Sequence, residues 1–180
     1  DPRWVFDIPP AGNANYAWLQ HMWNRLSSKG RAGIVLANGS MSSNTSNEGV
    51  IRKNMIKGNA VECMVALPAQ LFSNTQIPAW AWFLSRDKSA GAIGRSDRTN
   101  QVLFIDVRKI ASGRLSRTQI EFTESELNEL SQIYHRWRGT EFADDADYED
   151  VPGLCYSATT DVIERHNFNL SPGRYVGAAD

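Results

Sequence analysis

Apolar residues recur at helical spacing in four parts of the chain, and short runs of consecutive apolar residues lie between them. Helical spacing predicts amphipathic helices. Short apolar runs bounded by turn residues predict strands, and the first two runs have the composition of strands buried on both faces. The expected helices cover residues 13–26, 47–57, 123–137 and 159–166. The expected strands cover residues 31–37, 60–67, 77–84 and 101–107.

The order of these elements predicts an α/β fold with a mixed sheet. Strands that alternate with helices favour parallel pairing through right-handed crossovers. The connection over residues 68–76 holds no helix and is too short for such a crossover, so the second and third strands are predicted to pair antiparallel. Residues 85–100 are polar and are predicted to form a mobile loop or hairpin tip.

Composition narrows the class of protein. The chain has 180 residues, a net charge of -1 and 42% hydrophobic residues, which excludes disorder and gives no global positive field to attract nucleic acid. It has no run of roughly 18 apolar residues and no secretory signal, so no membrane contact is expected. Cys63 and Cys155 lack metal or redox spacing and fit free thiols in the cytoplasm.

Generic catalytic motifs are missing from the sequence. There is no glycine-rich phosphate loop and no Gly-x-Ser-x-Gly nucleophile turn, which argues against a small α/β hydrolase. The three histidines are far apart, and the acidic run 144–150 lacks the pattern of a calcium loop, so no metal site is expected. Residues 7–10, Asp-Ile-Pro-Pro, differ from the Asp/Asn-Pro-Pro-aromatic motif of amino-methyltransferases and are interpreted as a loop.

Two polar loops follow the predicted strand ends, where α/β sheets bind ligands. Asn38, Gly39 and Ser40 follow the first strand. The loop over residues 67–78 follows the second strand, and in it Phe72 is surrounded by amides and hydroxyls. Stacking combined with hydrogen bonds to the base edge is how proteins hold an extruded base. The alternative is that Phe72 merely fills a gap in the core.

Five segments resemble the modification (M) subunit of type I restriction–modification systems, which belongs to the N6-adenine DNA methyltransferases. These segments are residues 13–21, 30–40, 67–78, 148–153 and 170–176. The resemblance implies part of a Rossmann-like sheet of an S-adenosylmethionine-dependent methyltransferase, with an antiparallel strand pair, followed by C-terminal helices. Residues 1–110 would be the C-terminal half of the catalytic domain, and residues 111–180 a C-terminal helical region.

The resemblance further implies that this chain, which begins at Asp1, is a fragment of its parent protein. The family's cofactor loop and its Asn-Pro-Pro-Phe motif lie upstream of the matching segments and are not among these residues. The parent is expected to transfer a methyl group from S-adenosylmethionine to adenine N6 in double-stranded DNA. The isolated chain is expected to be inactive and not to bind this cofactor tightly. Expected partners are DNA and the specificity and restriction subunits.

Site residues are carried over from the family one by one. Target-base or DNA contacts are expected from Asn38, Ser40, Phe72, Asn74 and Thr75. The rim of the cofactor and substrate cleft is expected to include Asn13, Asn15 and Tyr16. Gly173 and Tyr175 match a C-terminal family pattern without assigned chemistry. The rival hypothesis is a non-catalytic module that only contacts a specificity subunit or DNA.

Overall fold

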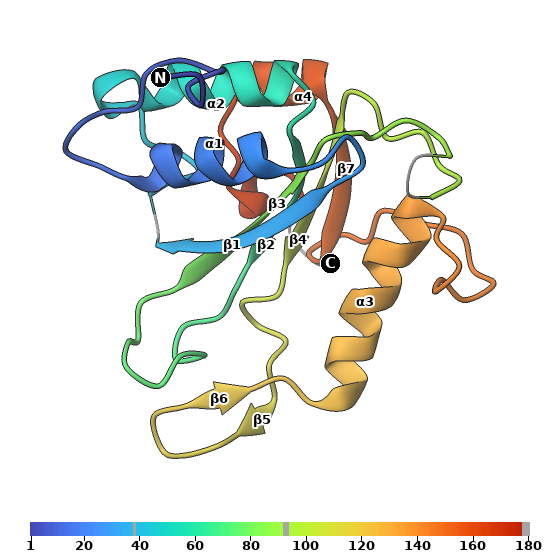
Figure 1. Cartoon of the computed structure of the whole chain (residues 1–180). Coiled ribbons are helices and arrows are strands. Elements are labelled where there is room, and N and C mark those ends of the chain that lie inside the picture. Colours follow the sequence, from blue (N-terminus) through green and yellow to red (C-terminus); the bar gives the residue numbers. More distant parts are fainter. Residues whose placement is uncertain (38, 92–93, 178–180) are drawn as a thin grey trace.

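The computed structural model describes residues 1–37, 39–91 and 94–177 (Figure 1). The helices are α1 (Asn15–Arg25), α2 (Glu48–Lys57), α3 (Glu124–Arg138) and α4 (Thr160–Arg165), with short 3₁₀ turns η1 (Thr45–Asn47) and η2 (Pro172–Arg174). The strands are β1 (Arg31–Ala37), β2 (Val61–Ala66), β3 (Ala79–Ser85), β4 (Gln101–Asp106), β5 (Gly113–Arg114), β6 (Ile120–Glu121) and β7 (Cys155–Thr159).

Five of these strands form one mixed sheet in the order β1-β3-β2-β4-β7, and β5 and β6 form a separate hairpin. The predicted antiparallel pairing of the second and third strands is confirmed, with Met64 opposite Trp82. β2 also pairs in parallel with β4, where Met64 lies opposite Phe104. β1 and β7 lie at the two edges, and each pairs antiparallel with its neighbour.

Helices cover the two faces of the sheet unequally. Figure 1 shows α1, α2 and α4 together on one face, where Leu19 and Ile51 belong to a large apolar core. α3 packs on the other face through Ile133 and Trp137, against Leu103 of β4. The predicted capping box begins α3, because the Thr123 hydroxyl accepts from the Glu126 N–H and the Glu126 carboxylate accepts from the Thr123 N–H.

The prediction that the first strand is buried on both faces is wrong. In β1 only Leu36 is buried, while Gly33, Val35 and Ala37 are exposed on the face away from α1. Val35 is 49% exposed. Within the described residues no strand pairs with the outer edge of β1, so β1 presents an open edge and a partly uncovered apolar face.

Two further features were not predicted from the sequence. The region 111–180 is not only helical, because it supplies β7, the last strand of the main sheet, and the β5–β6 hairpin. The polar segment 85–100 was expected to be a mobile loop, but Lys88 and Arg98 within it are buried. The division of the chain at residue 110 stays a prediction.

Candidate functional site at the carboxyl edge of the sheet

The carboxyl ends of β1, β2 and β4 lie at one edge of the sheet. β1 and β2 both pair antiparallel with β3 and therefore run in the same direction, and β4 is parallel to β2. The loop that follows β1, the loop 67–78 that follows β2 and the segment that follows β4 all leave from this edge. Open α/β sheets bind their ligands at such an edge, so the fold collects the predicted polar loops in one place.

The start of α1 is tied to the loop after β1 by buried hydrogen bonds. The Tyr16 hydroxyl donates to the Ser40 carbonyl at 2.5 Å, and the Ser40 hydroxyl accepts from Trp82 Nε1 at 3.1 Å. Arg52 of α2 donates to the Tyr16 hydroxyl at 3.2 Å. Burial raises the pKa of Tyr16 to about 12, and the Arg52 guanidinium acts in the opposite direction. Tyr16 therefore stays a neutral phenol that positions the loop.

The predicted site residues near β1 differ in their exposure and in their access to a pocket. Ser40 is only 2% exposed, so its burial favours a supporting role over contact with a base. Asn38 lies outside the described residues. Asn13 lines a pocket of about 350 Å³ together with Ser43 and Glu48. Glu48 is buried, and its Oε2 accepts from the Ser43 hydroxyl while its Oε1 has no hydrogen-bond partner among the described residues.

Asn13 and Asn15 lie together at the beginning of α1. The Asn13 side-chain oxygen accepts from the Asn15 N–H at 3.0 Å, which satisfies one of the free N–H groups of the first helical turn. Asn13 is exposed and Asn15 is half-buried. Of the three predicted rim residues, Asn13 lines the pocket, Asn15 donates its N–H to Asn13, and Tyr16 is buried in the core.

The loop 67–78 projects beyond the edge of the sheet. Phe72 is 39% exposed, and Asn74 and Thr75 are exposed beside it. Phe72 and Thr75 form an isolated bridge that closes the loop tip, and the Thr75 hydroxyl oxygen accepts from the Ile77 N–H at 3.1 Å. The alternative that Phe72 fills the core is therefore not what the structure shows. The loop presents an aromatic face with polar groups beside it.

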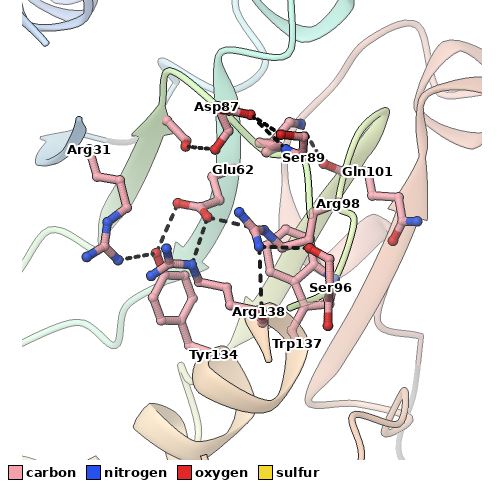
Figure 2. A network of polar contacts seen from close by, with 12 residues as sticks. Arg31, Glu62, Asp87, Ser89, Ser96, Arg98, Gln101, Tyr134, Trp137 and Arg138 are labelled. Atoms are coloured by element: carbon pink, nitrogen blue, oxygen red, sulfur yellow. Dashed lines mark hydrogen bonds and ion pairs between the residues drawn. The ribbon is translucent and has the colours of Figure 1, made fainter. Parts of the chain in front are cut away.

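A second polar cluster, which was not predicted from the sequence, lies at the opposite ends of the strands (Figure 2). Glu62 of β2 is fully buried, and its Oε1 lies 3.1 Å from Arg138 Nε and 3.6 Å from Arg98 Nε. Its Oε2 accepts from the Tyr134 hydroxyl at 3.0 Å. Both arginines are also buried, so two cations share one carboxylate. Because α3 carries Tyr134 and Arg138, this cluster joins α3 to the sheet.

Lys88 completes the buried cluster from the segment after β3. Its ammonium group donates to the Val61 carbonyl at 3.0 Å and to the Gln101 carbonyl at 2.7 Å. Burial lowers the pKa of Lys88 to about 7, and Glu62 opposes this shift. These contacts position the segment and carry no group that is arranged to act on a substrate.

The lowered pKa of Lys88 leads us to predict that the free energy of unfolding depends on pH above neutrality. Between about pH 7 and the ordinary pKa of 10.5 the unfolded chain holds the Lys88 proton and the folded chain does not. The free energy of unfolding therefore rises with pH in this window, by at most about 1.4 kcal/mol per pH unit. Urea denaturation between about pH 7 and pH 9 measures it. In Lys88→Met this contribution disappears, and an identical slope in the two proteins would refute the assignment.

The remaining chemistry-bearing residues are structural. Cys63 and Cys155 are free and buried, as predicted for free thiols, and burial raises the pKa of each thiol. Within residues 1–37, 39–91 and 94–177 no group of three His, Cys, Asp or Glu side chains is arranged to hold a metal ion. Across the same ranges no helix has both the length and the apolar character needed to cross a bilayer.

Comparison with known proteins identifies the family of this chain. The sequence profile of the N-6 DNA methylase family matches residues 1–180. The chain belongs to the N-6 DNA methylase family. It is 48% identical over 180 residues to the type I restriction enzyme HindI methylase subunit of Haemophilus influenzae. It is 36% identical over 170 residues to the type I restriction enzyme MjaIX methylase subunit of Methanocaldococcus jannaschii.

A solved structure of the same family shares the fold. The type I restriction-modification system methyltransferase subunit from Streptococcus thermophilus superposes with a TM-score of 0.78 and 27% identity, over 99% of this chain and 34% of that one. The predicted resemblance and the mixed methyltransferase-type sheet are confirmed. The first match takes in 100% of this chain and 38% of the Haemophilus relative, and the second takes in 94% of this chain and 28% of the Methanocaldococcus relative.

Proposed function

We propose that this chain forms the target-facing part of a type I DNA methyltransferase subunit, called the parent subunit below. The parent subunit transfers a methyl group from S-adenosylmethionine to adenine N6 in double-stranded DNA. The observation that carries the proposal is the family match along the whole chain, combined with an exposed aromatic loop at the ligand-binding edge of the sheet.

The loop 67–78 supplies contacts that suit an extruded adenine. The half-exposed ring of Phe72 offers a stacking surface for a base. The Asn74 carboxamide is exposed and makes no hydrogen bond within the described part of the chain, so it is free to meet a base edge. The Thr75 hydroxyl accepts from Ile77 and keeps its own proton to donate. In this proposal the chain holds the base and leaves methyl transfer to groups elsewhere in the parent subunit.

The pocket beside Asn13, as lined by the described residues, does not by itself fit S-adenosylmethionine. The pocket beside Asn13 has Ser43 bound to Glu48 and the Asn13 oxygen bound to Asn15, so one Glu48 oxygen is the unpartnered buried acceptor of its lining. A ligand with a carboxylate, an ammonium group, a ribose and an adenine needs many more contacts. We therefore place the cofactor site mainly in the remainder of the parent subunit, with this pocket at its border.

The expected partners follow from the type I family. This chain has a net charge of -1 and so no general attraction for DNA, and in this proposal a separate specificity subunit supplies sequence-specific binding. The restriction subunit would join the same complex. The rival function, a module that only contacts other subunits, predicts that the loop 67–78 is dispensable for methylation.

Phe72→Ala in the parent subunit tests the proposed function. Loss of base stacking of about 1–3 kcal/mol predicts a roughly 5- to 150-fold lower kcat/KM for methylation. The assay mixes the parent subunit, its specificity subunit, duplex DNA and S-adenosylmethionine, and measures N6-methyladenine after digestion to nucleosides. Assembly of the complex, measured by gel filtration, is expected to be unchanged.

Phe142→Ala is the matched control for this experiment. Phe142 is 66% exposed but follows α3, far along the chain from the loop. Its loss is expected to leave methylation unchanged. Wild-type methylation by Phe72→Ala, or loss of assembly with normal methylation per complex, would favour the interaction module instead. Absence of N6-methyladenine with the unaltered parent subunit would reject the proposed reaction.

A further inference from the structure

The β5–β6 hairpin, residues 113–121, is separate from the main sheet and has no role in the proposed function so far. Arg114 lies opposite Ile120, and the N–H groups of Leu115 and Ser116 both donate to the Gln119 carbonyl, at 3.0 and 3.2 Å. Figure 1 shows the hairpin projecting at the lower end of the molecule, beyond the carboxyl edge of the main sheet. We call residues 113–121 the basic hairpin.

Positive charge is concentrated in and just before the basic hairpin. Residues 107–121 contain Arg108, Lys109, Arg114 and Arg117, and Glu121 at the end of β6 is their one acidic residue, in a chain whose net charge is -1. Arg108 is paired with Asp106 at 2.6 Å. Lys109, Arg114 and Arg117 are exposed and form no ion pair within the described residues. This segment therefore carries a net positive charge, and within the described residues Glu121 forms no ion pair with its cations.

The basic hairpin lies directly beside the loop that carries Phe72. The Ile120 N–H donates to the Gln70 carbonyl at 3.1 Å, and Gln70 precedes Phe72 by two residues. Arg114 is the cross-strand neighbour of Ile120, so its backbone is one strand away from the loop. A base held against Phe72 remains attached to a backbone with a phosphate on each side. Cations next to this loop are therefore placed to meet those phosphates.

We propose that the basic hairpin grips the DNA backbone beside the target nucleotide, with Arg114 and Arg117 as the phosphate contacts. This inference rests on the proposed function and assigns a DNA-binding element to it. Arginine suits the role because its planar guanidinium binds two phosphate oxygens at once. Phosphate contacts set register and orientation on the duplex without reading its sequence.

The composition of the basic hairpin favours DNA over a protein partner. Between its strands and at its turn it presents mostly guanidinium, hydroxyl and amide groups, which are the groups that bind phosphate oxygens. These residues are Arg114, Ser116, Arg117, Thr118 and Gln119. Leu115, 60% exposed, is the one large apolar side chain among them. The buried centre of a protein–protein interface is instead rich in aromatic and aliphatic residues.

The test uses the complete complex of parent subunit and specificity subunit. Arg114→Ala/Arg117→Ala is compared with the wild type and with Arg95→Ala/Arg165→Ala, which removes the same charge from exposed positions in the segment before β4 and at the end of α4. Fluorescence anisotropy gives the Kd for duplex DNA at several KCl concentrations. Each lost phosphate contact lowers the slope of log K against log salt by about 0.9, so the hairpin variant is expected to lose nearly two units of slope.

The proposal is supported if the hairpin variant shows the same fold-increase in Kd on specific and non-specific duplexes, together with the reduced slope. The control variant is expected to keep a slope close to that of the wild type. A wild-type slope in the hairpin variant overturns the inference, whether or not its affinity changes. Loss of specificity-subunit binding by gel filtration, with normal slope, also overturns it in favour of a protein contact. Failure of the wild-type complex to methylate DNA, measured in the separate methylation assay, would reject the proposed function.

Discussion

Glu62→Gln is expected to lower the free energy of unfolding of this chain by about 3–5 kcal/mol, because it removes the negative charge of a buried carboxylate that two buried arginines share. Arg98 and Arg138 both direct Nε toward Glu62 Oε1, at 3.6 and 3.1 Å (Figure 2). Burial lowers the pKa of Arg98, and Glu62 opposes that shift. The amide keeps the size of the carboxylate but not its charge. Urea denaturation followed by tryptophan fluorescence measures the loss.

Two comparisons make this prediction specific to charge burial. Asp144→Asn breaks the exposed ion pair between Asp144 and Arg136 and is expected to change stability little, because solvent already screens it. Replacing Glu62, Arg98 and Arg138 together by apolar side chains of similar size is expected to recover most of the lost stability. If Glu62→Gln unfolds at the same urea concentration as the native chain, the cluster does not bind α3 to the sheet as described.

The sequence predicted the elements whose patterns are local. The helix after Thr123 followed from its capping box, and the antiparallel turn between β2 and β3 followed from a connection too short for a crossover. For Phe72 the local pattern left two placements open, a base-stacking ring or a ring that fills a gap in the core, and the structure shows the ring 39% exposed. Each of these features depends on residues close together in the chain.

The features that were missed depend on residues far apart in the chain. Glu62 and Arg138 are separated by 76 positions, and nothing in the local pattern shows that they meet. Lys88 and Arg98 lie in a polar stretch typical of a solvated loop, yet their partners bury them. β7 is a short strand with small and polar residues, and pairing with β4 provides its stability. Ser40 was predicted to contact DNA from a loop, but its carbonyl and hydroxyl are bound by Tyr16 and Trp82, which are distant in the sequence.

The error at β1 is informative about the account as a whole. An apolar strand that was expected to be buried instead has an open edge and an exposed Val35. A strand of seven residues with unpaired backbone groups is a ready site for pairing with another strand. We interpret this edge as the junction with the rest of the parent subunit. In this proposal the apolar composition of β1 suits a sheet that continues into the rest of the parent subunit.

Calorimetric titration of S-adenosylmethionine tests this central claim most directly. Titrated into the 180-residue chain, the cofactor is expected to give no saturable heat at micromolar concentrations, because in the proposed function the pocket beside Asn13 is only the border of the cofactor cleft. The parent subunit, titrated under the same conditions, is expected to bind. Binding to the chain alone with micromolar affinity would contradict the account, since the complete cofactor site would then lie within these residues.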